Sequence, residues 1–224
     1  MKVTLFDTHV HTDEVSRCAQ MPAADVVRHY ADAGYDGLIV TDHLSRHTFA
    51  HMENADWNAK IDHFLTGYHL ALAQSKQYAD FTVLLGAEVR LDCDADNDYL
   101  LYGVSEAFLR SAPDILQMSF ESMASLVREH GLLLVQAHPF RECMQIADWR
   151  LLDGVEVFNG NPSHESNNPI ADAWAERHGL LKTSGSDFHG LWTKKVGGIV
   201  TTCPIHNNEQ LLSVLQSGAY STLQ

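Results

Sequence analysis

The amino-acid sequence predicts one α/β domain whose strands close into a barrel. The chain of 224 residues has the size of a single α/β barrel. No clear linker divides it, so the domain is expected to span residues 1–224. Short apolar runs alternate with helical patterns, which favours a parallel sheet with right-handed crossovers. The number of strand candidates favours closure into a barrel over an open sheet.

The strand candidates are short apolar runs with the length of buried strands. In chain order they are Val3–Phe6, Gly37–Thr41, Thr82–Ala87, Tyr99–Val104, Leu132–Gln136, Gly154–Phe158, Leu180–Thr183 and Gly197–Thr201.

The helix candidates lie between several of these strands. The first begins with Pro22, which a first helical turn tolerates, and stops at Gly34, where the chain is free to leave the helix. The others are expected at Ala55–Tyr78, Ser119–His130, Asn168–His178 and Asn207–Gln216.

Composition narrows the class of protein. Hydrophobic residues make up 45% of the chain, which is enough for a substantial core. The formal charge of −14 opposes general binding to nucleic acid or anionic membranes, although bound metal ions would let a single phosphate group bind. No apolar run is long enough to span a membrane, and the N-terminus reads as a strand. The scattered Cys18, Cys93, Cys143 and Cys203 are interpreted as free thiols of a reducing cytoplasm.

Histidines and carboxylates recur where the strand candidates end. In FDTHVHTDEVS, His9 and His11 are one residue apart and share a face if the segment is a strand. A single such pair is also typical of a polar surface strand, but reactive groups of α/β folds gather beyond the carboxyl ends of the strands. The remaining strand-end residues are Asp42, His43, Glu88, His138, Asp187 and His189. Imidazole and carboxylate ligands suit zinc, manganese or iron, and a set of this size predicts two or three divalent ions.

The motifs HVH, TDH, GAE, AHP and SDFH, in this order and spacing, resemble those of the PHP (polymerase and histidinol phosphatase) superfamily. Its members are metal-dependent phosphoesterases built on a distorted (β/α)7 TIM-like barrel. The segments EVFNGNPSHESN and DYLLYG also resemble a bacterial subgroup of stand-alone PHP proteins. The resemblance covers the chain from about Phe6 to Gly190.

The resemblance implies a site for three metal ions. His9, His11, Glu88 and Asp187 would hold the first ion, and Glu88 would bridge to a second ion bound by His138. A third ion would take His43 and His189. Glu88, Asp187 and His189 are assigned as the catalytic residues.

Two positions depart from the family pattern. An acid or histidine is common five or six residues after the second histidine, where this chain has Ser16 or Arg17, so Glu14 is predicted to replace it. Asp98 stands where the family often has a histidine, and it is predicted as a metal ligand.

Four further residues are candidates for substrate binding. Arg90 and Arg141 follow predicted ligands closely enough to bind phosphate, although Arg141 is equally consistent with a surface arginine. Asn161 and His164 lie in the NGNPSHES loop, which Gly160 and Pro162 also shape. The pair Lys194–Lys195 is interpreted as a solvated turn.

These observations predict hydrolysis of a small phosphorylated metabolite by a metal-activated water in a di- or trinuclear site. Amide or lactone hydrolysis, exonuclease activity and a metal-binding module without turnover are the alternatives. The sequence specifies neither the substrate nor the oligomeric state.

Overall fold

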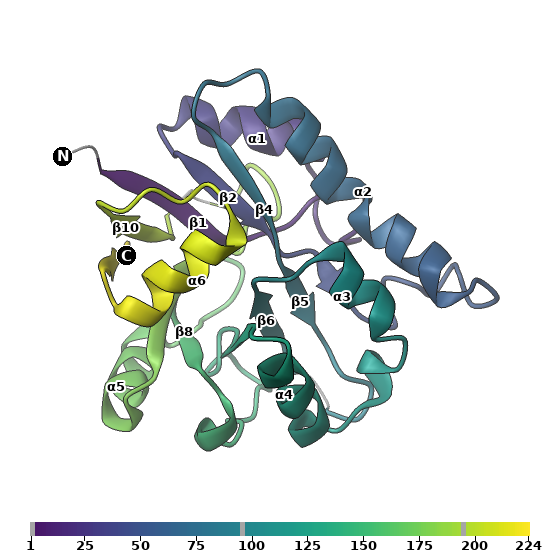
Figure 1. Cartoon of the computed structure of the whole chain (residues 1–224). Coiled ribbons are helices and arrows are strands. Elements are labelled where there is room, and N and C mark those ends of the chain that lie inside the picture. Colours follow the sequence, from purple (N-terminus) through teal and green to yellow (C-terminus); the bar gives the residue numbers. More distant parts are fainter. Residues whose placement is uncertain (1–2, 95–96, 194–195) are drawn as a thin grey trace.

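The computed structural model describes residues 3–94, 97–193 and 196–224, so Lys194 and Lys195 lie outside the described residues. Its described strands form two hydrogen-bonded sheets with helices packed around them (Figure 1). The predicted α/β class is therefore confirmed.

The first sheet has five strands. In spatial order they are β11 (Tyr220–Thr222), β10 (Ile199–Thr201), β1 (Thr4–Val10), β2 (Gly37–Val40) and β4 (Thr82–Leu85). The second sheet has six strands: β3 (His43–Leu44), β5 (Ala87–Val89), β6 (Tyr99–Tyr102), β7 (Leu133–Gln136), β8 (Gly154–Asn159) and β9 (Leu181–Gly185).

The strand pairing corrects the expectation of a closed parallel barrel. β6 is antiparallel to both β5 and β7, and β10 is antiparallel to β1. The segment between β5 and β6 contains no described helix, so the chain turns back on itself there instead of crossing over. The ladder also breaks at Gly86, between β4 and β5, and at Thr41–Asp42, between β2 and β3. The described strands therefore form two sheets and not a closed barrel.

The two sheets nevertheless meet where β1 lies beside β9. Thr8 Oγ1 donates a hydrogen bond to the carbonyl oxygen of Ser184 at 2.9 Å. An isolated parallel bridge joins Val10 to Phe188, just beyond the ends of the two strands. The residues that follow β1 and β9 are consequently held side by side.

Side-chain caps begin most of the described helices. The side chains of Asp56, Ser105, Ser119 and Asn207 each accept a hydrogen bond from the amide three residues ahead. The α-helices are α1 (Ala23–Asp32), α2 (Trp57–Ser75), α3 (Glu106–Ser111), α4 (Phe120–Glu129), α5 (Asn168–His178) and α6 (Asn208–Ser217), with 3₁₀ turns at Ile115–Gln117 and Trp149–Leu151. Helix α3 and the strands β3, β5 and β11 were not predicted as separate elements from the sequence.

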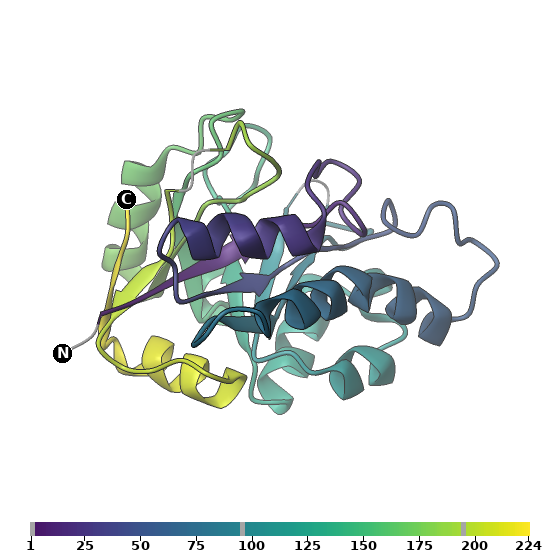
Figure 2. The same cartoon turned by 90° about the horizontal axis from the view of Figure 1, so that it is seen from above.

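Three apolar clusters join the helices to the sheets. One packs α1 and part of α2 against β2 and β4, through residues such as Tyr30 and Leu38. Another packs α2, α3 and α4 against the second sheet, and the third packs α6 against β1, β6, β7 and β10. Figure 2 shows α1 and α6 on different sides of the strands, with both chain ends on the same side of the molecule. Within the described segments, no helix combines the length and apolar character needed to cross a membrane.

Candidate metal centre

His9 and His11 direct their imidazoles from the end of β1 into one buried cluster. Both side chains are fully buried, and their Nε2 atoms lie 3.0 Å apart. Nδ1 of His9 lies 2.8 Å from Oε1 of Glu156, on β8. An ionised carboxylate only accepts hydrogen bonds, so Nδ1 of His9 carries the proton. In the neutral ring, the form that binds metals, Nε2 of His9 therefore presents a lone pair to the cluster.

A chain of hydrogen bonds fixes His11 in the same tautomer. Ser16 Oγ donates to Oδ1 of Asp42 at 2.7 Å, so it accepts a hydrogen bond from Nδ1 of His11 at 3.1 Å. The hydroxyl also accepts from the backbone N–H of His43 at 3.0 Å. Nε2 of His11 is therefore the second lone pair that points into the cluster.

Glu88, on β5, lies at the centre of the imidazoles and is completely buried. Its Oε1 lies 3.3 Å from Nε2 of His9 and 3.2 Å from Nε2 of His138. Its Oε2 lies 3.4 Å from Nε2 of His11 and 2.7 Å from Nδ1 of His43. Within the described residues, however, no well-formed hydrogen bond reaches Oε2. Glu88 thus contacts four of the histidines that the sequence predicted as ligands.

Asp187 completes the cluster from the segment that follows β9. Its Oδ1 lies 3.3 Å from Nε2 of His11 and 3.5 Å from Nε2 of His9. His189 lies beside it, with Nδ1 2.9 Å from the carbonyl oxygen of Asp187. Asp187 and His138 have φ values of +50° and +29°, which non-glycine residues seldom adopt. Such backbone strain is concentrated at functional sites.

The donor set fits divalent metal ions. The Nε2 atoms of His9 and His11 lie 3.0 Å apart and would both carry lone pairs in the neutral rings, and the carboxylates of Glu88 and Asp187 face them. Only positive charge, from a metal ion or from added protons, satisfies so many converging acceptors. The ligand atoms of three groups lie within 4.8 Å of one another: His9–His11–Glu88, His11–His43–His189 and His43–Glu88–Asp98. Mixed nitrogen and oxygen donors of this kind suit zinc, manganese or iron.

The electrostatics of the cluster keep its carboxylates ionised. Burial alone would raise the pKa of Glu88, but the imidazoles of His43 and His9 outweigh it and hold the pKa well below its usual range. The pKa of Asp187 is held low in the same way, against burial, by His9 and His189. Burial alone would lower the pKa of His189, but the carboxylate of Asp187 outweighs burial and raises the pKa to about 10. Two charged carboxylates are therefore available to bind cations at neutral pH.

A pocket of 440 Å³ opens onto this cluster. Its lining includes the metal-ligand candidates His43, Glu88, Asp98, His138, Asp187 and His189 together with Arg17, Cys18, Arg90, Arg141, Asn161, His164 and Trp192. All four residues predicted to bind substrate therefore line the pocket.

The two predicted arginines make different contacts in the pocket. Nη2 of Arg141 donates to Oδ2 of Asp187 at 2.8 Å and to Oδ1 of Asn159 at 3.1 Å. Nε of Arg141 is buried and has no hydrogen-bond partner within the described residues. Arg90 instead forms a two-point pair with Asp98, through Nε at 2.7 Å and Nη2 at 2.5 Å. Nδ2 of Asn161 donates to the carbonyl oxygen of Asp187 at 3.3 Å.

Glu14 is a correction to the predicted ligand set, because the structure does not bring it to the cluster. Its two carboxylate oxygens lie 3.1 and 3.0 Å from the backbone nitrogen of Ala23, the first residue of α1. Pro22 has no N–H, so Ala23 offers the first amide of this helix. A carboxylate is also favoured at the positive end of a helix. Asp98, by contrast, reaches the cluster and belongs to one of the three ligand groups.

Several residues of the site were not identified as site residues from the sequence. Ser16 and Glu156 orient His11 and His9, as described above. Glu156 lies in EVFNG, a segment that the resemblance quoted without assigning this role. Cys18, interpreted as an ordinary free thiol, lines the pocket together with His43 and His189. Burial alone would raise the pKa of its thiol, but these two imidazoles outweigh burial and lower the pKa to about 6.

Solved structures with the same fold include several proteins of one kind. A two-domain protein from Bacteroides vulgatus that contains a predicted PHP-like metal-dependent phosphoesterase matches with a TM-score of 0.72 at 15% identity, over 99% of this chain and 64% of that one. A protein from Bifidobacterium adolescentis, assigned by prediction as a metal-dependent phosphoesterase, matches with a TM-score of 0.58 at 17% identity, over 94% and 95%.

A third solved structure with the same fold is that of a nuclease. The lesion-specific endonuclease EndoQ from Pyrococcus furiosus matches with a TM-score of 0.65 at 16% identity, over 99% of this chain and 58% of that one. The chain thus spans about two thirds or less of the length of two of these three proteins. No protein-family model and no curated protein matches it.

The fold and the site together define the class of protein: an α/β chain that gathers histidines and carboxylates, which are candidate ligands of divalent metal ions, in one buried cluster. The structural neighbours identify the fold as that of the PHP-like metal-dependent phosphoesterases. The chain therefore shares the fold of a protein that contains a predicted PHP-like metal-dependent phosphoesterase, which agrees with the resemblance indicated by five short motifs.

Proposed function

We propose that this protein is a metal-dependent hydrolase of the PHP superfamily that cleaves a small phosphate ester. The observation that carries the proposal is the lining of the pocket: Arg17, Arg90 and Arg141 surround it in a chain whose formal charge is −14. Arginines gathered over a metal-binding cluster favour an anionic substrate with several oxygen atoms, and phosphate has this chemistry.

Metal ions bound at the cluster would supply positive charge for the phosphate oxygens and would acidify an attacking water. His9, His11, Glu88 and Asp187 would hold these ions, together with His43, His138 and His189. The protein residues around the ions would bind and orient the substrate.

Arg141 is the residue proposed to bind the phosphate group. Asp187 and Asn159 hold its Nη2, so the guanidinium is fixed before substrate arrives. Its buried Nε has no hydrogen-bond partner in the described part of the chain and would gain one from a phosphate oxygen. Asn161 and His164 lie at the same pocket and would contact the rest of the substrate.

The pocket volume of 440 Å³ supports a small phosphorylated metabolite as the substrate. The negative charge of the chain argues against general binding of nucleic acid, although the fold is shared with an endonuclease. Manganese, zinc and iron all fit the ligand types of the cluster.

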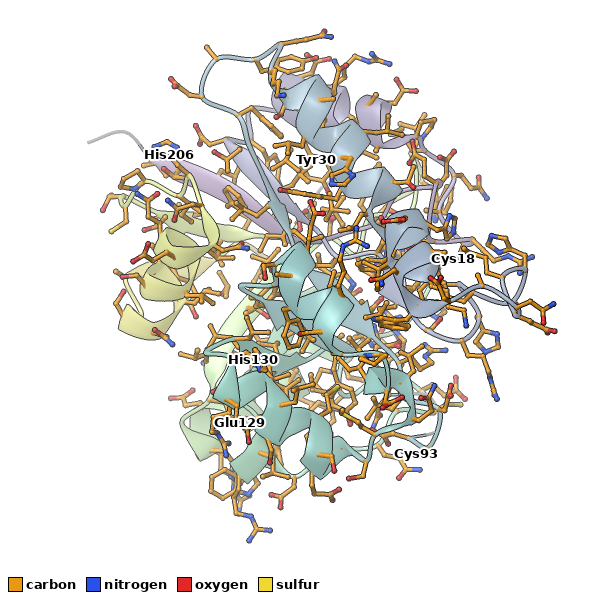
Figure 3. The ribbon with its side chains drawn as sticks, turned by 45° about the vertical axis from the view of Figure 1, so that its right-hand side comes forward. Cys18, Tyr30, Cys93, Glu129, His130 and His206 are labelled. Carbon is orange, nitrogen blue, oxygen red and sulfur yellow. The ribbon has the colours of Figure 1, made fainter. Side chains whose placement is uncertain are left out.

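Release of inorganic phosphate from a panel of phosphomonoesters and nucleotides tests this proposal. Protein reconstituted with Mn²⁺ is compared with a chelated control and with two variants. His11→Ala removes a buried ligand candidate and is expected to abolish release. His206→Ala changes an exposed histidine far from Cys18 and the pocket (Figure 3) and is expected to retain activity.

The result also separates the alternatives. Full activity of His11→Ala would overturn the proposed site. Cleavage of an amide, a lactone or single-stranded DNA, without turnover of any phosphomonoester, would redirect the proposal to another hydrolase. Tight metal binding with no turnover of any kind would indicate a metal-binding module.

A further inference from the structure

The loop between β1 and α1 places Cys18 at the edge of the metal cluster. Ala19 N donates to the carbonyl oxygen of Ser16 at 2.8 Å and closes a tight turn around Cys18. Ser16 is anchored by its side-chain hydrogen bond to Asp42. On the other side, Gln20 N donates to the carbonyl oxygen of His189 at 2.8 Å. Cys18 thus lies between Ser16, whose hydroxyl contacts His11, and Gln20, whose amide contacts His189.

The thiol of Cys18 faces two of these candidates at once. Cys18 lines the pocket together with His43 and His189, and interaction with these two imidazoles lowers the pKa of its thiol against the effect of burial. The ring centres of His43 and His189 lie 5.8 Å apart, and the ring of His11 lies 4.4 Å from the first and 4.2 Å from the second. Cys18 therefore borders a group of three imidazoles whose nitrogens lie within 4.8 Å of one another.

A separate observation indicates that a cation belongs at this place. Oε2 of Glu88 is fully buried and has no well-formed hydrogen bond within the described residues, yet it lies 2.7 Å from Nδ1 of His43. A buried carboxylate oxygen without a well-formed hydrogen bond is a favourable partner for a cation. A metal ion bound by His43 would be such a cation.

We propose that the thiolate of Cys18 is a ligand of the ion held by His43 and His189. The inference rests on the metal binding in the proposed function and adds a sulfur donor to it. On binding, the thiol would release its proton to solvent and the sulfur would form a bond to the metal. Cys18 would take the place that the sequence prediction gave to Glu14. A thiolate donor favours zinc, iron or cobalt over manganese at this position.

Cobalt substitution tests the proposal directly, because thiolate ligands of Co²⁺ give a charge-transfer band in the near ultraviolet and imidazole or carboxylate ligands do not. Metal-free wild-type protein, Cys18→Ser and Cys93→Ser are titrated with Co²⁺. Cys93 is the matched control, since its exposed thiol donates to the carbonyl oxygen of Met118 at 3.1 Å and lies apart from Cys18 (Figure 3). The band is expected in the wild type and in Cys93→Ser. In Cys18→Ser the band is expected to be absent, and one Co²⁺ ion fewer is expected to bind per chain.

Alkylation of the wild type by iodoacetamide gives a second readout that does not depend on a variant folding. Zn²⁺ is expected to suppress modification of Cys18 and to leave that of Cys93 unchanged, as mapped by peptide mass spectrometry. A charge-transfer band that persists in Cys18→Ser, or equal alkylation of Cys18 with and without Zn²⁺, would overturn the proposal. Neither readout needs turnover, so a protein that shows the band but hydrolyses no phosphate ester would refute the proposed function alone.

Discussion

Replacing Glu156 by glutamine is expected to weaken metal binding without unfolding the protein. The carboxylate of Glu156 accepts hydrogen bonds from three groups: His9 Nδ1 at 2.8 Å, the backbone N–H of His138 at 3.0 Å and Nδ2 of Asn159 at 2.9 Å. The amide oxygen of glutamine can serve the last two donors. Its NH₂ group then faces Nδ1 of His9, where a proton already resides.

The magnitude follows from this mismatch. In Glu156→Gln, His9 either moves its proton to Nε2 and loses the lone pair that faces the cluster, or keeps its tautomer and loses a charge-assisted hydrogen bond. Losing such a buried bond costs about 1.5–3 kcal/mol. A tenfold change in affinity corresponds to about 1.4 kcal/mol, so Kd is expected to rise roughly 10- to 100-fold, as is usual when the partner of a ligating histidine is changed.

Competition with a chelator of known affinity measures this change, and circular dichroism of the metal-free variant checks the fold. Glu129→Gln is the control, because Glu129 is an exposed residue at the end of α4 (Figure 3). Wild-type Zn²⁺ affinity in a folded Glu156→Gln would refute the reasoning, since it would show that the carboxylate does not set the tautomer of His9.

Two further predictions concern stability. Burial is the main cause that raises the pKa of Asp7 from 3.8 to about 6. Between these pH values the folded state therefore binds more protons than the unfolded state. The resulting contribution to stability, about 3 kcal/mol, is lost as the pH rises through 6. Asp7→Asn is therefore expected to flatten the dependence of the urea midpoint on pH between 4 and 7 in metal-free protein, and an unchanged slope would contradict this. Chelation is expected to lower Tm by roughly 5–10 °C for each ion present at about 100 times its Kd, because such binding stabilises by about 2.7 kcal/mol; an identical Tm with and without metal, by calorimetry, would show that the cluster is not loaded.

The sequence predicted where strands end better than how they pair. Apolar runs such as Gly37–Thr41 and Leu132–Gln136 match β2 and β7 closely, because a buried strand requires a local run of apolar residues. The direction of β6 could not be predicted from its own residues. Its run, Tyr99–Val104, has the composition of any buried strand, and its antiparallel pairing depends on neighbours distant in the sequence. The expectation of a parallel sheet was wrong at β6 for this reason.

The same division holds for the site. Residues at strand ends, such as His9 and Glu88, could be predicted because the edge of a sheet gathers them whatever the loops do. The loop after β1 could not be read in this way. Whether Glu14 or Cys18 approaches the cluster depends on one turn, closed by Ala19 N, and on the free amide of Ala23, which attracts the carboxylate of Glu14.

Arg90 and Asp98 form an ion pair whose net charge equals that of the neutral histidine expected at this position. The sequence assigned Arg90 to phosphate and Asp98 to a metal, at a position where the superfamily often has a neutral histidine. In the structure the guanidinium holds both carboxylate oxygens, and Oδ2 of Asp98 lies 3.9 Å from Nε2 of His138. The pair has the net charge of the histidine that it replaces, namely zero. Each carboxylate oxygen keeps a second lone pair, so Asp98 can ligate without adding charge to the cluster, while Arg90 remains at the pocket wall. Removing Arg90 is therefore expected to change the charge at the candidate metal cluster as well as the wall of the pocket.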